Sequence, residues 1–164
     1  MMEGAQVDVR ENVPIRSFSI SVYICRIEHG NARFLLLKRS SPYLHGTWQM
    51  VSGKIERGET AWQAALREIR EETGLVPDRL YTASELELFY DCHENCIRLV
   101  PVFVAFIDSQ QSVVLSSEHS EYKWMDSGES GSFFSFPHQV ETALRIEAMY
   151  VKQTPFEHLR VVTA

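Results

Sequence analysis

The hydrophobic pattern near the start of the chain predicts strands separated by turns. From 17 to 27, apolar residues alternate with other types and many are β-branched, which predicts a strand with one face in the core. Gly30 and Asn31 predict a hairpin turn, and the nearly continuous apolar run at 33–39 predicts a strand buried on both faces. After a polar loop, residues 48–51 predict a further short strand.

The pattern changes to a helical period between Thr60 and Thr73. Apolar positions there recur three or four residues apart, which places them on one stripe of a helix. The stripe consists of Trp62, Ala65, Leu66, Ile69 and Thr73. Thr60 is the predicted N-cap, Gly74 is the predicted left-handed residue after the helix, and Pro77 prevents its continuation.

The second half of the chain returns to strands and ends with another helix. Strands are predicted at 85–92, 97–107 and 121–125, so the sheet is expected to be mixed or partly antiparallel. A Gly/Ser-rich loop at 127–132 leads to an amphipathic helix that starts at Pro137. Its predicted buried stripe is Val140, Ala143, Leu144, Ala148 and Val151.

Length and composition are those of a single globular domain. The chain has 164 residues, of which 45% are hydrophobic and 23% are charged. We predict an N-terminal tail at 1–15, an α/β domain at 16–151 and a C-terminal extension at 152–164. The extension can fold back, remain loose or reach another subunit, so both a monomer and a homodimer remain open.

The net charge and the apolar segments of the chain disfavour some classes of binding partner and cellular location. Sixteen Lys and Arg face 22 Asp and Glu, giving a formal charge of −6, which disfavours binding to a nucleic-acid polymer. No apolar run approaches the roughly 18 residues of a membrane span, so no membrane partner is expected. With three cysteines and no basic segment followed by an apolar stretch at the N-terminus, the prediction is a reduced, cytoplasmic protein.

The chemistry of the chain concentrates on the first predicted helix. At about 100° per residue, Glu68, Glu71 and Glu72 share one sector, beside the apolar stripe. Like charges at this spacing repel unless a cation neutralises them. Carboxylates that gather in this way suit Mg²⁺ or Mn²⁺, which bind few carboxylates together with substrate phosphates and water.

Residues around these three glutamates have predicted supporting roles. Arg67 faces Glu71 at i+4 and can hold it by a charge-assisted bond, while Glu59 can fix the preceding loop or complete an outer shell. Gly53 lies in that loop, where a glycine permits close backbone approach and its carbonyl oxygen can add to a metal's ligands.

The stretch at 53–75 resembles the Nudix hydrolase box. It matches Gly-x5-Glu-x7-Arg-Glu-(aliphatic)-x-Glu-Glu-x-Gly-(aliphatic) at every specified position. The resemblance implies a Nudix fold, an α/β/α sandwich with a mixed sheet, over roughly 16–151. It also implies cleavage of a nucleoside diphosphate linked to another group, with the metal ligands Glu68, Glu71, Glu72 and the Gly53 carbonyl.

Two further segments, 46–60 and 116–126, are similar to the branch of this family that hydrolyses dihydroneopterin triphosphate and nucleoside triphosphates. In family members a glutamate before the final strand often contributes a ligand or general base, and Glu118 corresponds to it, with Glu121 as a close competitor. Where the family commonly has Pro-Gly-Gly, this chain has Val-Ser-Gly at 51–53, which leaves the geometry of that loop open.

Candidate substrate contacts lie around the second strand. Lys38 and Arg39 end that strand and can meet phosphate oxygens. Tyr43 and His45 can flank a planar base, as can Trp48 unless it belongs to the core.

These observations predict a Mg²⁺-dependent pyrophosphohydrolase, with Mn²⁺ as the other candidate ion, that acts on a small-molecule phosphoanhydride. Either Glu68 or Glu118 is expected to take the proton of the attacking water. A dinucleoside polyphosphate or nucleotide-sugar hydrolase would use the same metal site with a different pocket. A non-catalytic nucleotide-binding module is the other alternative, although this chain retains all the acids that such a module can lose.

Overall fold

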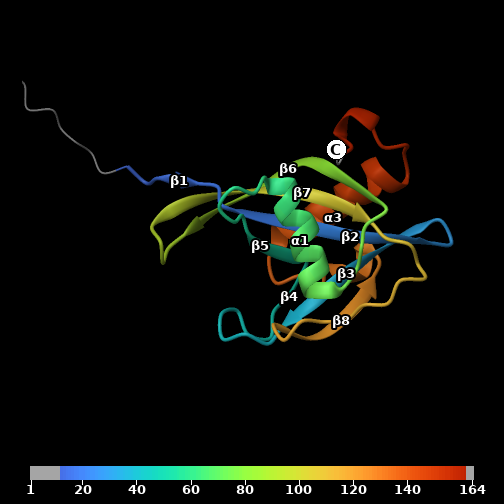
Figure 1. The fold of residues 1–164 in the computed structure, drawn as a ribbon, viewed down its shortest axis with the longest axis horizontal. Coiled ribbons are helices and arrows are strands. Elements are labelled where there is room, and N and C mark those ends of the chain that lie inside the picture. The colour runs from blue at the N-terminus through green and yellow to red at the C-terminus, as the bar shows by residue number, and fades with distance from the viewer. Residues whose placement is uncertain (1–11, 162–164) are drawn as a thin grey trace, which may run out of the picture.

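The computed structural model describes residues 12–161 and forms three layers. A mixed eight-stranded sheet has helix α1 on one face and helix α3 on the other (Figure 1). The elements are β1 (Ile15–Arg16), β2 (Ser19–Glu28), β3 (Asn31–Arg39), β4 (Trp48–Gln49), β5 (Val51–Lys54), α1 (Ala61–Thr73), β6 (Arg79–Asp91), β7 (Cys96–Phe106), β8 (His119–Met125), α2 (Ser127–Ser130), α3 (Pro137–Ile146), a π-helix (Glu147–Val151) and a 3₁₀ helix (Glu157–Leu159). The predicted α/β/α sandwich is confirmed.

Strand β2 is the centre of the sheet. It pairs in parallel with β7 and antiparallel with both β3 and β5. Strand β6 pairs antiparallel with β7, and β8 pairs antiparallel with β3. Among the described strands β5 pairs only with β2, so its other side is a sheet edge.

The sheet separates two hydrophobic clusters, one on each face. Ile20, Val22 and Ile24 of β2 pack with the residues of α1. Tyr23 and Cys25 point to the opposite face and pack with the residues of α3. The prediction that this strand buries only one face is therefore wrong, because a helix covers each side of the sheet.

The β2–β3 turn lies one residue earlier than predicted. His29 and Gly30 occupy it with φ of 51° and 80°, and Asn31 already belongs to β3. Two successive residues with positive φ match the twist of the flanking strands in a two-residue hairpin.

Helix α1 begins and ends where its sequence predicts. Thr60 accepts from the Gln63 N–H, and the Gln63 side chain accepts from the Thr60 N–H, which completes a capping box. Gly74 has φ 68° and donates its N–H to the Arg70 carbonyl. Ala64, Ala65 and Ile69 are fully buried against the sheet, so packing fixes the direction of the carboxylates on the same helix.

The C-terminal half differs from its predicted pattern in three places. Residues 127–130 form the short helix α2, capped by Asp126, instead of a loop, and β6 starts at Arg79, before the predicted 85. On α3 and the π-helix the predicted stripe is right for Val140, Ala143 and Val151, which pack on the core, and wrong for Leu144, which is 49% exposed, and for Ala148, which is also exposed. The buried face consists of Gln139, Thr142, Ala143, Ile146, Glu147 and Tyr150. Polar residues of α3 face the sheet, and the π-helix after it widens the turn and shifts the register.

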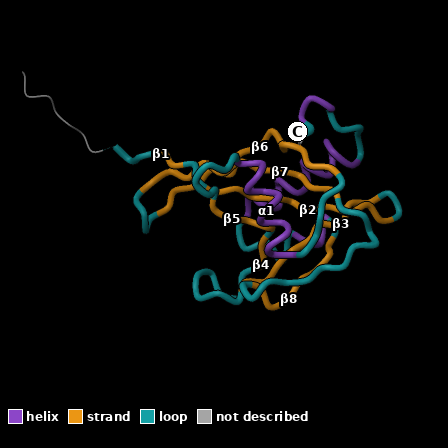
Figure 2. Tube along the Cα trace, viewed as in Figure 1, coloured by secondary structure: helices purple, strands orange, loops and turns teal. Residues whose placement is uncertain are grey.

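Both ends of the described chain are hydrogen-bonded to the domain. Ile15 pairs with Ile97 of β7, while residues 1–11 of the predicted tail lie outside the described residues. The C-terminal segment folds back, since the Val161 N–H donates to the Leu80 carbonyl at 2.8 Å. Figure 2 shows the long β7–β8 loop passing the end of α1, where the Val114 N–H donates to the Thr73 carbonyl. None of the helices in the part described is long and apolar enough to cross a membrane.

Candidate active site

The three carboxylates of α1 lie at different depths. Glu72 is only 5% exposed, and the side chain of Glu68 is 13% exposed. The side chain of Glu71, by contrast, is 58% exposed. Packing of the helix on the sheet thus turns Glu68 and Glu72 toward the protein and leaves Glu71 at the surface.

Gly53 of β5 lies directly against the Glu68 carboxyl group. A Cβ atom at position 53 would be 2.0 Å from both Cδ and Oε1 of Glu68, a distance that real atoms do not reach. Only a glycine leaves room for the carboxylate at this point, so the predicted close approach of this backbone to the acidic cluster is present.

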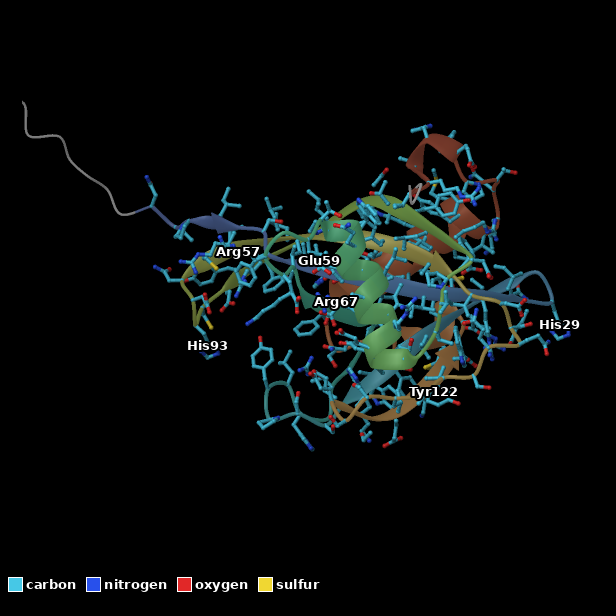
Figure 3. The ribbon with its side chains drawn as sticks, in the orientation of Figure 1. His29, Arg57, Glu59, Arg67, His93 and Tyr122 are labelled. Carbon is cyan, nitrogen blue, oxygen red and sulfur yellow. The ribbon has the colours of Figure 1, made fainter. Side chains whose placement is uncertain are left out.

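Arg67 connects the acidic residues around it. Its guanidinium donates from Nε and Nη2 to the two carboxylate oxygens of Glu59, each at 2.9 Å. Its Nη1 donates to Glu68 at 2.7 Å and to Glu71 at 3.0 Å, and its Nη2 also donates to the Lys54 carbonyl at 2.8 Å. Figure 3 shows Glu59 and Arg67 beside each other at α1. Arg67 therefore fixes the loop before the helix and two of the three helix carboxylates.

Glu72 has an unusual electrostatic environment. Burial, followed by the charges of Glu68 and Glu118, raises its pKa to about 9, and Arg39 and the Ser52 main chain only partly oppose the rise. Its Oε2 atom is buried without a hydrogen-bond partner among the described residues. The raised pKa means that the positive charge near the buried Glu72 carboxylate is too small to balance its negative charge.

Arg39 and Glu118 meet at the edge of this cluster. Arg39 Nη2 lies 3.7 Å from Glu118 Oε2 and donates to Ser41 Oγ at 2.7 Å, while Nε donates to the Tyr43 carbonyl. The Ser40 N–H donates to the Glu118 carbonyl at 2.8 Å, which holds the β7–β8 loop against the end of β3. The structure thus brings Arg39 and Glu118 to the helix carboxylates.

Lys38 and Glu121 lie on the other face of the sheet. They pair across β3 and β8, with Lys38 Nζ 2.6 Å from Glu121 Oε1. Because neighbouring strand residues point to opposite faces, Lys38 is separated from Arg39. Of the two competing acids, Glu118 is therefore the one beside the cluster.

The three candidate base contacts are dispersed. Tyr43 is 67% exposed, and its ring centroid is 6.0 Å from the Arg39 guanidinium. His45 is exposed in the same loop. Trp48 is half-buried on the α3 face, where its ring meets Phe133 edge-on at 5.9 Å and lies 5.7 Å from Lys38 Nζ.

The oxygen donors fit a divalent cation that is shared with a substrate. Across residues 12–161, three or more carboxylate, imidazole or thiol groups do not converge as a complete metal site. Arg67 occupies one oxygen each of Glu68 and Glu71. However, the unpartnered Glu72 oxygen and the mutual repulsion of Glu72, Glu68 and Glu118 call for positive charge. An ion such as Mg²⁺, which takes few protein carboxylates and completes its shell with phosphates and water, meets this need.

Sequence reasoning missed His119, which lies beside the cluster. It pairs with Arg39 across β8 and β3 and is 5% exposed, with neither ring nitrogen hydrogen-bonded to a described residue. Burial and the Arg39 charge lower its pKa, so it is neutral near pH 7. A register shift between Lys38 and Arg39 places it there, and no local sequence pattern reports such an irregularity.

Comparison with known proteins agrees with this geometry. The NUDIX domain family model matches residues 17–141. The chain is 34% identical over 104 residues to asymmetrical bis(5'-nucleosyl)-tetraphosphatase of Caenorhabditis elegans, covering 59% of this chain and 70% of that protein. It is 29% identical over 118 residues to dihydroneopterin triphosphate diphosphatase of Escherichia coli K12, covering 65% and 77%. A solved C. elegans Ap4A hydrolase complex has the same fold, with a TM-score of 0.70 at 24% identity over 83% of this chain and 96% of that one.

Proposed function

Because the chain belongs to the Nudix hydrolase family, we propose that it is a metal-dependent pyrophosphohydrolase. Its substrate in this proposal is a nucleoside triphosphate or a related triphosphate such as dihydroneopterin triphosphate, and its products are the monophosphate and pyrophosphate. The family and the E. coli relative support this reaction class.

Each residue of the cluster has a role in this proposal. The oxygen donors for the ion are Glu68, Glu71, Glu72, Glu118 and the Gly53 carbonyl. When bound, Mg²⁺ or Mn²⁺ supplies positive charge at the phosphate oxygens. Arg39 binds a phosphate through its planar guanidinium, and Arg67 orients Glu68 and Glu71.

The hydrolytic step needs a base for the attacking water. Glu68 and Glu118 are the two candidates, since both lie close enough to Glu72 to raise its pKa. One of them takes the proton as the water oxygen bonds to phosphorus, and the bond from phosphorus to the leaving pyrophosphate oxygen breaks.

The observation that carries the proposal is Glu72, buried with a free oxygen beside Glu68 and Glu118. Glu72→Gln keeps the shape of the side chain and removes its charge. We expect turnover of the best substrate to fall at least about 100-fold while the fold persists. The measurement is Mg²⁺-dependent release of pyrophosphate from a panel of triphosphates, with direct detection of the other product.

A matched control keeps this test specific. Glu157 is an exposed glutamate far along the chain whose ion-pair partner among the described residues is Arg160, so Glu157→Gln should leave turnover unchanged. Wild-type turnover in Glu72→Gln, or equal losses in both variants, would reject the role of Glu72.

Hydrolysis of a dinucleoside polyphosphate is the second candidate function. The C. elegans relative favours it, and so does an aromatic and cationic surface on the α3 face. There the Trp48 ring lies 5.7 Å from Lys38 Nζ and 5.2 Å from Lys123 Nζ, which suits a second base and its phosphate. Product analysis separates the two functions, because this reaction yields two nucleotides and no pyrophosphate.

A further inference from the structure

The hairpin of β6 and β7 carries apolar side chains that are exposed to solvent. Leu86, Leu88 and Tyr90 are two residues apart on β6, so all three point to one side of the sheet, and they are 60%, 62% and 56% exposed. On β7 the same side continues to Phe103, which belongs to the hydrophobic cluster under α1. The hairpin therefore extends the α1 side of the sheet beyond the part that α1 covers. Figure 3 shows its far end, at His93, away from α1.

Neighbouring strands extend this apolar side across three strands. Residues directly opposite each other on paired strands point to the same side of a sheet. Leu88 lies opposite Leu99, and Tyr90 lies opposite Ile97, which in turn pairs with Ile15 of β1. Ile15 is 67% exposed. We call this surface the hairpin face, and it consists of Ile15, Leu86, Leu88, Tyr90, Ile97 and Leu99.

The opposite side of the same hairpin is charged and is covered by α3. Glu87 is buried there, and Glu85 pairs with Arg145 of α3 at 3.1 Å. Strands with one covered side usually place their apolar residues on that side and their charged residues in water. Residues 85–88 have the reverse arrangement. An exposed apolar patch of this kind marks a surface that another molecule covers.

Contacts within the chain hold the hairpin in one geometry. Asp91 Oδ1 accepts from the Glu94 N–H at 3.2 Å, and Asp91 Oδ2 accepts from Arg98 Nε at 3.1 Å. At the other edge the Ile97 N–H donates to the Pro14 carbonyl at 2.8 Å, which fixes β1 on β7. A preformed face of this kind loses little conformational freedom when it binds a partner.

The charges of the chain favour a second copy as the partner. Two copies that each carry a formal charge of −6 repel each other, so the best contact between them is one without charge. The six residues of the hairpin face include no charged side chain. A bilayer fits less well, because anionic lipids attract basic residues, whereas Asp91 and Glu94 lie at the end of this hairpin.

The size of the hairpin face also fits a dimer. Four of its six side chains are more than half exposed and two are partly buried, so at roughly 150 Å² for each fully exposed large side chain the face offers on the order of 400 Å². An interface of standard size covers about 800 Å² on each partner, of which roughly 60% is apolar. The hairpin face therefore supplies most of the apolar share of such an interface.

From these observations we infer that the protein forms a homodimer through the hairpin face. Two copies pack these faces against each other about a two-fold axis, as two sheets pack roughly 10 Å apart in a sandwich. Leu88 lies in the middle row of the face, so the two Leu88 side chains meet near the centre of the interface. The inference goes beyond the proposed function, because it requires neither a metal ion nor a substrate.

Sedimentation velocity of the full-length protein tests this interface. We expect a dimer at concentrations of about 1 to 50 µM. Leu88→Glu places two negative charges at the centre of the interface, so it should raise the dissociation constant at least about 100-fold and give a monomer. Leu144→Glu is the matched control, because Leu144 is 49% exposed on α3, and it should remain a dimer. Circular dichroism checks that both variants are folded.

Two outcomes would overturn the inference. A wild-type monomer at all these concentrations would mean that residues 1–11 or a different protein cover the hairpin face. A dimer that persists in folded Leu88→Glu would place the interface elsewhere on the chain.

Photo-crosslinking provides a second measurement that does not depend on Leu88→Glu. The photoreactive residue p-benzoylphenylalanine replaces Tyr90, whose aromatic ring it resembles. Irradiation should link two chains, and the linked peptides should contain residues of the hairpin face. The same residue at position 144 should give no linked pair. A lack of linked chains from position 90, or links only to other surfaces, would reject the hairpin face as the interface.

Discussion

At the scale of single residues, the contact between Gly53 and Glu68 is the most demanding feature of the site. With the Glu68 carboxylate in its present position, a Cβ at Gly53 would lie 2.0 Å from the carboxyl carbon. Gly53→Ala must therefore displace either the carboxylate or strand β5. We expect turnover to fall about 100-fold, since misplacement of a catalytic group by about 1 Å costs that much.

Steady-state kinetics at saturating Mg²⁺ check this prediction, with Gly128→Ala as the control. The nearest atom to a Cβ at position 128 is 3.6 Å away, an ordinary contact, so that variant should keep wild-type kinetics. Normal turnover in Gly53→Ala would mean that Glu68 has another productive position.

At the scale of elements, the capping box of α1 is the clearest local determinant. Thr60→Ala removes the acceptor for the Gln63 N–H and should lower the free energy of unfolding by about 1 kcal/mol. Thr60→Ser keeps the hydroxyl, so it should lower the free energy of unfolding much less. Urea denaturation of the three proteins measures the difference, and equal midpoints would show that the cap contributes nothing.

Local signals of this kind explain which elements the sequence predicts. The bounds of α1 follow from Thr60, a helical stripe and Gly74, all of which act within a few residues. On α3 the apolar pattern misled at Leu144, because the polar residues Gln139 and Thr142 face the sheet in addition to Ala143. A polar residue on a buried face can be anticipated only when its tertiary partner is known.

The candidate site likewise has one part that local sequence signals predict and another that depends on strand pairing. Glu68, Glu71, Glu72 and Arg67 share one helix, so their periodicity is enough to group them. The separation of Arg39 from Lys38 and the placing of His119 beside Arg39 depend on the pairing of β3 with β8. Partners across strands are far apart in the sequence, and an irregularity in their register leaves no mark on its apolar pattern.

At the scale of the whole molecule, the site and the core are largely independent. Two hydrophobic clusters hold the sheet and helices together, and neither includes Glu68, Glu71 or Glu72. Removal of divalent ions with EDTA should therefore abolish activity and leave the circular dichroism spectrum unchanged. Readdition of Mg²⁺ should restore activity.

In the proposed function Mg²⁺ binds the folded chain, so it should also raise the melting temperature. At a Mg²⁺ concentration about 100 times the Kd, the free energy of unfolding rises by roughly 2.7 kcal/mol. For a chain of this size, the melting temperature then rises by several degrees. Differential scanning calorimetry should show a smaller shift in Glu72→Gln. An equal shift in both proteins would place the ion elsewhere.

The guanidinium of Arg67 holds Glu59, Glu68 and Glu71 together, and it supplies positive charge to them when no metal is bound. It acts as a tethered counter-ion that cannot diffuse away when free magnesium runs low. It thus offsets the repulsion among Glu59, Glu68 and Glu71, whereas Glu72 and Glu118 lie outside its contacts. In the proposed function, metal binding is then an exchange of partners by side chains that are already in place.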